Sequence, residues 1–172
     1  WIGADEPGGA FQGAAVLAGG WIVAALAGLS LDASPRMLRV ARRLGHEYPV
    51  TVSTSLLAAH ALPPEYTGRA DEYVDLVCRE WLPALRSDCD AVDAYCEDIA
   101  FSAAQCDRLF AAARACGLPV RLHTEQLSNV GGSQVAARHG ARSADHLEYA
   151  TEGDAAALAR ALQTRGQKVH LA

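Results

Sequence analysis

The stretch SAAQCDRLFAAARACGLPVRLHTEQ, residues 102–126, decides the fold. It opens with the pattern of a capping box, because Ser102 is followed three residues later by Gln105. Small and apolar residues then recur at helical spacing until Gly117, which is typical of a helix end. An apolar run with a strand pattern follows at once over Pro119–Thr124. A helix that leads straight into a buried strand is half of a repeating unit, and it favours the α/β class.

The same alternation extends outward on both sides of this stretch. We predict helices over Pro35–Leu44, Ala70–Arg86, Ser102–Cys116, Gly131–His139 and Glu152–Arg165. We predict strands over Tyr48–Leu57, Ala91–Cys96, Pro119–Thr124, Arg142–Leu147 and Gln167–Leu171. Strands separated by helices pair in parallel through crossovers, and they make either an open doubly wound sheet or part of an eight-stranded barrel. The glycine fingerprint of a dinucleotide fold is absent, because Gly131-Gly132 lacks its spacing.

The composition predicts one soluble globular domain in the cytoplasm. The chain has 172 residues, of which 51% are hydrophobic and 20% charged, so it can bury a sizeable core. A net charge of -5 and dispersed arginines disfavour nucleic acid as a partner. Glycines interrupt the apolar segment Ala14–Leu31, so we predict no membrane span. The five cysteines form no CxxC pair and are expected to be reduced, with only Cys96 near a site.

Histidines follow three of the predicted strands. His60 comes after the strand over 48–57, His123 ends the strand over 119–124, and His146 ends the next one. The carboxyl ends of parallel strands meet at one edge, where a barrel assembles its chemistry, so we predict one shared site. The remaining histidines are interpreted as exposed or hydrogen-bonded side chains without a functional role: His46, His139 and His170.

Further polar residues flank these histidines. Gln126 lies where the chain turns and suits an amide or a ring nitrogen. His146 stands between Asp145 and Glu148, carboxylates that can orient its ring. Strand alternation leaves the direction of Glu125 open, and we assign it no catalytic role. The chain contains neither HxH nor HExxH, so we expect it to offer one or two metal ligands rather than a standard set of three or four.

Three segments in order resemble the imidazolonepropionase family of the amidohydrolase superfamily. They are AHALPPEY at 59–66, the LHTEQLSNVGG core of 118–132, and SADHLEY at 143–149. The resemblance implies a metallo-dependent (β/α)8 barrel of the TIM type, of which this chain supplies about five units. Residues 29–172 are then a partial barrel domain, and residues 1–28 are a divergent segment that we cannot place.

The resemblance also implies an activity and a set of roles. Members of the family use one divalent ion, zinc or iron, to hydrolyse 4-imidazolone-5-propanoate to N-formimidoyl-L-glutamate in histidine degradation. By this resemblance, His123 corresponds to the metal-binding histidine of the fifth barrel strand. His146 corresponds to the catalytic histidine of the next strand, which helps to activate water. His60 and Gln126 correspond to substrate-binding positions. A small-molecule substrate and a homodimer of the full-length enzyme are implied as partners, with no nucleic acid and no membrane.

The chain also departs from the family pattern. The HxH pair and the metal-binding aspartate of the family fall outside it, and AALAG at 24–28 stands where the family has KSGYG, which puts Ala27 at a substrate-binding tyrosine position. We therefore interpret the chain as an internal fragment and expect it to be inactive in isolation. The alternatives are another cyclic-amide amidohydrolase or deaminase on the same barrel, and a truncated remnant without catalysis.

Overall fold

The structure, a computed structural model, describes residues 33–164. Its centre is a parallel sheet whose strands follow one another in space in the order of the chain. The strands are β1 (Ser55–Ala59), β2 (Ala91–Cys96), β3 (Val120–Thr124) and β4 (Ala144–His146). The helical elements are α2 (Ala33–Glu47), η1 (Pro64–Tyr66), α3 (Ala70–Leu76), η2 (Val77–Trp81), α4 (Leu82–Leu85), α5 (Ala103–Ala115), α6 (Gly132–His139) and α7 (Glu152–Gln163).

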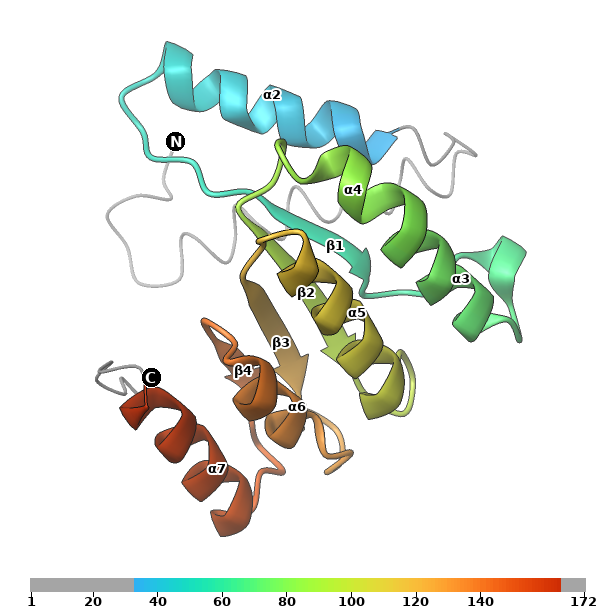
Figure 1. The fold of residues 1–172 in the computed structure, drawn as a ribbon, viewed down its shortest axis with the longest axis vertical. Coiled ribbons are helices and arrows are strands. Elements are labelled where there is room, and N and C mark those ends of the chain that lie inside the picture. The colour runs from blue at the N-terminus through green and yellow to red at the C-terminus, as the bar shows by residue number, and fades with distance from the viewer. Residues whose placement is uncertain (1–32, 165–172) are drawn as a thin grey trace.

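The arrangement of the helices distinguishes between the two α/β architectures. In Figure 1, α4, α5 and α6 lie on the same side of the sheet. A doubly wound sheet reverses its strand order and carries helices on both faces, whereas a barrel keeps sequential order with its helices outside. The described part of the chain follows the second pattern, as a segment of a TIM-type barrel does. The predicted α/β class and barrel architecture are therefore confirmed.

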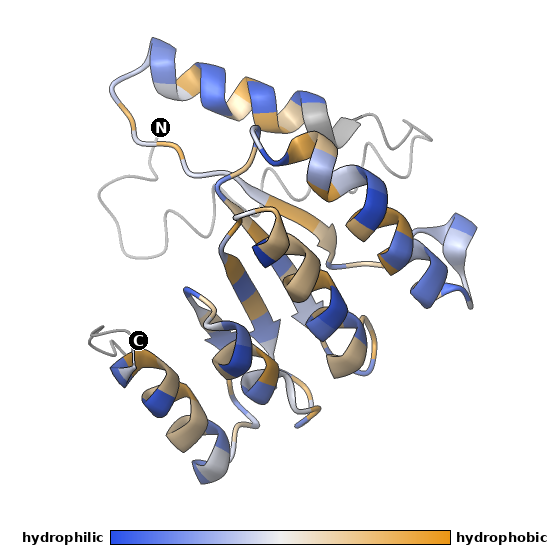
Figure 2. Ribbon diagram, in the orientation of Figure 1, coloured by the Kyte–Doolittle hydropathy of each residue, from blue (hydrophilic) through white to orange (hydrophobic). Residues whose placement is uncertain are grey.

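The core lies between the sheet and these helices. Val92 and Ala94 of β2 and Leu122 of β3 are at most 1% exposed and pack in one cluster with residues of α5, among them Phe110. Figure 2 shows the apolar stretches along the strands beneath the helices. Successive residues of a strand point to opposite faces. The residues between these core positions therefore lie on the other face: Asp93, Tyr95, Arg121 and His123.

Most of the predicted helices and strands are confirmed. The capping box at Ser102 is present, since its side chain accepts from the backbone of Gln105 and the Gln105 side chain accepts from the backbone of Ser102. The helix predicted over Ala70–Arg86 is interrupted by the π-helical turn η2. Pro83 explains the interruption, because it has no N–H to donate to the carbonyl four residues earlier.

Two strand boundaries were wrong. The strand predicted over Tyr48–Leu57 begins only at Ser55, because Pro49 cannot donate to a ladder and the described sheet pairs β1 with β2 from Ser55 onward. The strand predicted over Arg142–Leu147 is reduced to Ala144–His146, because the backbone turns to positive φ at His146 and Leu147. Within residues 33–164 no helix is long and apolar enough to cross a membrane. The predictions for residues 1–28, Ala14–Leu31, Gln167–Leu171 and His170 lie outside the described residues.

Candidate metal and substrate site at the strand ends

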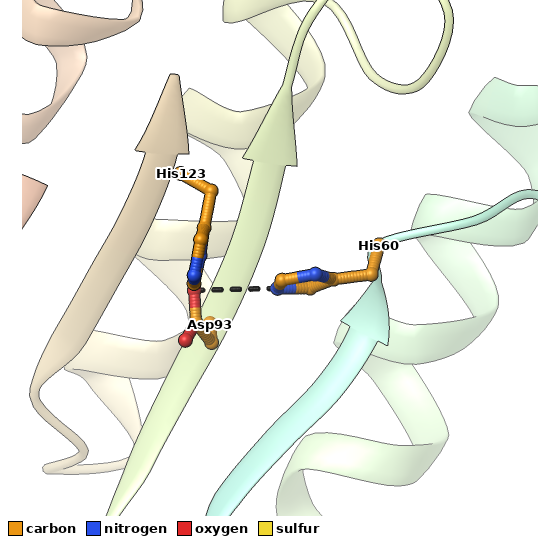
Figure 3. Close-up of side chains that lie close together, drawn as sticks. All are labelled: His60, Asp93 and His123. Atoms are coloured by element: carbon orange, nitrogen blue, oxygen red, sulfur yellow. Dashed lines mark hydrogen bonds and ion pairs between the residues drawn. The ribbon is translucent and has the colours of Figure 1, made fainter. Parts of the chain in front are cut away.

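A carboxylate on β2 joins two of the predicted site histidines. Asp93 Oδ1 lies 3.0 Å from Nδ1 of His123 on β3 and 3.3 Å from Nε2 of His60, which directly follows β1. The two imidazole rings meet edge to face, with their centroids 4.9 Å apart. Figure 3 shows both rings directed at the carboxylate from the two neighbouring strands. Adjacent parallel strands thus place three polar side chains around one point.

Asp93 is ionised in this setting. It is 5% exposed, and burial by itself acts to raise the pKa of its carboxyl group. The hydrogen bond from His123, together with the nearby His60 ring, outweighs burial and holds the pKa of Asp93 at about 2. The same hydrogen bond raises the pKa of His123, against an opposing effect of burial. The two groups therefore stabilise each other as an anionic acceptor and an N–H donor.

The donor set fits a divalent cation. One atom each from His60, Asp93 and His123 lies within 4.8 Å of the others. His60 Nε2 is buried and, despite its 3.3 Å distance from Asp93, is not oriented to complete a hydrogen bond within the described part of the chain. The described residues thus bring together three groups of the kinds that bind metals, Asp93 among them, and the expected number of ligands stays a prediction.

His146 lies beside this cluster. Its ring centroid is 5.4 Å from that of His123, and its side chain is 30% exposed. Its Nδ1 lies 3.9 Å from Glu148 Oε1, whereas Asp145 instead accepts a hydrogen bond from Ser143 Oγ at 2.8 Å. Only one of the two carboxylates expected to orient His146 is therefore within ion-pair distance. The structure brings all three predicted strand-end histidines together.

Gln126 is held in place by residues of β2 and the loop after it. Tyr95 donates its hydroxyl to Gln126 Oε1 at 2.8 Å. Glu97, 2% exposed, accepts from the backbone N–H groups of Gln126 at 2.7 Å and Leu127 at 3.0 Å. Burial acts to raise the pKa of Glu97, but these backbone donors and Ser128 bring it below its usual range. The Tyr95 hydroxyl thus orients the Gln126 amide.

Glu125, whose direction the sequence left open, points away from the histidines. Its φ of 50° breaks the strand alternation. Its fully buried carboxylate accepts from the backbone of Gly132 at 2.8 Å, from the backbone of Ser133 at 3.0 Å, and from the Ser133 hydroxyl. A carboxylate at the first turn of α6 satisfies free N–H groups and complements the helix dipole. Glu125 is therefore a helix-anchoring residue.

Sequence reasoning missed three residues of this site: Asp93, Tyr95 and Glu97. A signal for Asp93 was present, since it is an acidic residue inside the otherwise apolar strand AVDAYC. Cys96, expected near a site, is fully buried on the helix side of β2. Outside the site, His46 is exposed, and His139 Nε2 lies 3.1 Å from Asp107 Oδ1, as expected for residues without a functional role.

Comparison with known proteins identifies the relatives of the chain. No family model matches it. It is 62% identical over 136 residues to the imidazolonepropionase of Pseudomonas entomophila, covering 78% of this chain and 34% of that protein. It is 62% identical over 133 residues to the imidazolonepropionase of Serratia proteamaculans, covering 76% and 33%. The chain spans about a third of the length of the curated relatives it matches. At this level of identity, the chain belongs to the imidazolonepropionase family of amidohydrolases.

Proposed function

We propose that the complete protein hydrolyses the ring amide of 4-imidazolone-5-propanoate to N-formimidoyl-L-glutamate, with this chain supplying part of the active site. The observation that supports this most is the convergence of His60, His123 and His146 at one edge of a parallel sheet. The name shared by the relatives favours this reaction over other cyclic-amide hydrolases, deaminases and a non-catalytic remnant.

We propose His123 as a ligand of one divalent ion, zinc or iron. Such an ion supplies a Lewis acid that polarises an amide carbonyl and acidifies a water molecule. Both metals accept imidazole ligands, so His123 suits either. Metal analysis of the purified protein distinguishes them.

His146 is the proton-transfer group of this proposal. It lies beside His123 and keeps contact with solvent, and its Nδ1 faces Glu148. An imidazole in this position can take a proton from the attacking water and pass it to the leaving ring nitrogen. His60 and Gln126 bind substrate on the other side of His123, with the Gln126 NH₂ group as a hydrogen-bond donor. The carboxamide cannot itself transfer protons.

A hybrid enzyme tests the proposal directly. The segment of the Pseudomonas entomophila relative that matches this chain is replaced by the corresponding residues of this chain, and hydrolysis of imidazolonepropionate is measured. We expect activity in the hybrid and its loss in His123→Ala and His146→Ala. His139→Ala is the matched control, since His139 lies on α6 beside Asp107 and away from the site. A folded hybrid that hydrolyses hydantoin but not imidazolonepropionate would refute the substrate assignment.

The remaining features of the complete protein are also proposals. We expect the isolated 172-residue chain to show no hydrolysis, because it holds only part of the proposed ligand set. We propose a homodimeric cytoplasmic enzyme with a small-molecule substrate. Sedimentation of the hybrid at several concentrations reports the oligomeric state, and a monomer would contradict that part of the proposal.

A further inference from the structure

We infer that Asp93 is a positioning residue, which fixes the ring nitrogen that His123 presents to the metal. This inference rests on the proposed function and extends it to a residue of β2. The carboxylate lies between the two rings, buried at 5% exposure, and a single oxygen faces both of them. Figure 3 shows the Asp93 side chain, from within β2, between the two histidines at the ends of the neighbouring strands.

The geometry determines the role of each nitrogen. The 3.0 Å separation of Asp93 Oδ1 and His123 Nδ1 is a normal hydrogen-bond distance. An ionised carboxylate only accepts hydrogen bonds, so Nδ1 of His123 must carry the proton. The lone pair of His123 then lies on Nε2, the nitrogen left for a metal ion. Carboxylates that hold a metal-binding histidine in this manner fix both its tautomer and its ring orientation.

His60 lies on the other side of the same carboxylate. Its Nε2 is 3.3 Å from Asp93 Oδ1, within ion-pair distance, but it completes no hydrogen bond within the described part of the chain. The hydrogen bond of Asp93 therefore acts on His123, and His60 keeps the substrate-binding role proposed for it.

The other charged residues of this face do not replace Asp93. Arg121 pairs with Asp93 in the strand register, but it is a cation and cannot accept from either ring. Asp145 pairs with His123 across β3 and β4, yet its carboxylate accepts from Ser143 Oγ. Asp145 is therefore a matched control, because it is a carboxylate adjacent to the same histidine without its hydrogen bond.

The tautomer of His123 provides the first test. The 172-residue chain is labelled with ¹⁵N-histidine, and the imidazole resonances are recorded at alkaline pH in the unsubstituted chain, Asp93→Ala, Asp93→Asn and Asp145→Asn. We expect the Nδ1–H tautomer of His123 in the unsubstituted chain and in Asp145→Asn, and a shift toward the Nε2–H form in Asp93→Ala. An unchanged His123 tautomer in Asp93→Ala would overturn the inference. The isosteric Asp93→Asn variant and backbone amide spectra show whether Asp93→Ala has failed to fold.

Zinc binding by the hybrid enzyme provides the second test. Chelator competition should show zinc affinity reduced by about 10- to 100-fold in Asp93→Ala, less in Asp93→Asn, and unchanged in Asp145→Asn. The ¹⁵N shifts of the zinc form should place the metal on Nε2 of His123, and coordination through Nδ1 would overturn the inference. Hydrolysis is scored separately. If the tautomer and zinc results hold while imidazolonepropionate is not hydrolysed, the proposed reaction fails and the positioning role stands.

Discussion

Replacing Glu125 by glutamine separates helix anchoring from catalysis at a residue two positions after His123. The substitution keeps the size of the side chain but turns one carboxylate oxygen into an NH₂ group. In the structure, Oε1 accepts from the backbone of Gly132, while Oε2 accepts from the backbone and the hydroxyl of Ser133. Glutamine can keep the bond to Gly132, and the Ser133 hydroxyl can rotate to accept. The Ser133 N–H loses its 3.0 Å bond to Oε2 and keeps only its longer contact of 3.3 Å with Oε1, at a position where both residues are 0% exposed.

The expected cost follows from these contacts. A hydrogen bond to a charged group contributes about 1.5–3 kcal/mol, and a buried donor left unpaired costs about 1–3 kcal/mol. Loss of the negative charge at the first turn of α6 adds up to about 1 kcal/mol. Because these terms overlap, we expect Glu125→Gln to lower the free energy of unfolding by about 3 kcal/mol.

Urea unfolding of the 172-residue chain, followed by circular dichroism, measures this difference. Glu148→Gln is the matched control, because its carboxylate is 55% exposed and 3.9 Å from its partner, and its loss should cost less than about 0.5 kcal/mol. In the hybrid enzyme, Glu125→Gln should reduce the folded fraction rather than the turnover per folded molecule. A Glu125→Gln chain as stable as the unsubstituted one, together with a hybrid that is folded but inactive, would refute the anchoring role.

Three further predictions concern packing, substrate binding and pH. Gly132→Ala should destabilise the chain by about 3 kcal/mol in urea unfolding, because a Cβ there would lie 2.0 Å from Thr124 Oγ1 on a fully buried strand residue. Tyr95→Phe frees Gln126 Oε1 and should raise KM for imidazolonepropionate several-fold in the hybrid with a smaller change in kcat, and an unchanged KM would contradict the positioning of Gln126. Hydrogen bonds from Thr151 and neighbouring side chains outweigh burial and hold the pKa of Asp154 at about 2. The ionised Asp154 carboxylate should therefore contribute fully to stability above a pH of about 4, and this contribution should be lost as the pH falls toward 2. Asp154→Asn should flatten that part of the curve of unfolding free energy against pH.

The part of the site that follows strand periodicity could be predicted from the sequence. His123 and His146 were predicted to lie together because each ends a predicted strand, and parallel strands bring such ends to one edge of the sheet. Asp93 was missed because its importance depends on the register between strands. In the observed register Tyr95 of β2 stands beside His123 of β3, and this alignment brings the Asp93 carboxylate within reach of the His123 ring. A single sequence shows the order of strands but not which residues of neighbouring strands stand side by side.

The residues whose direction could not be predicted share a backbone feature. In residues 33–164, the non-glycine residues with positive φ are Glu125 at 50°, His146 at 81° and Leu147 at 70°, and all of them lie at the ends of β3 and β4. Such a conformation costs on the order of 1–2 kcal/mol per residue, so it persists only where the surroundings enforce it. At Glu125 the enforcing contacts are those with α6, which turn the carboxylate away from the site. At His146 the same conformation ends β4, so that the imidazole is not directed by strand alternation. Strained backbone conformations cluster at functional sites. Their position here, where β3 and β4 end beside the predicted histidines, therefore supports a functional role for this edge of the sheet.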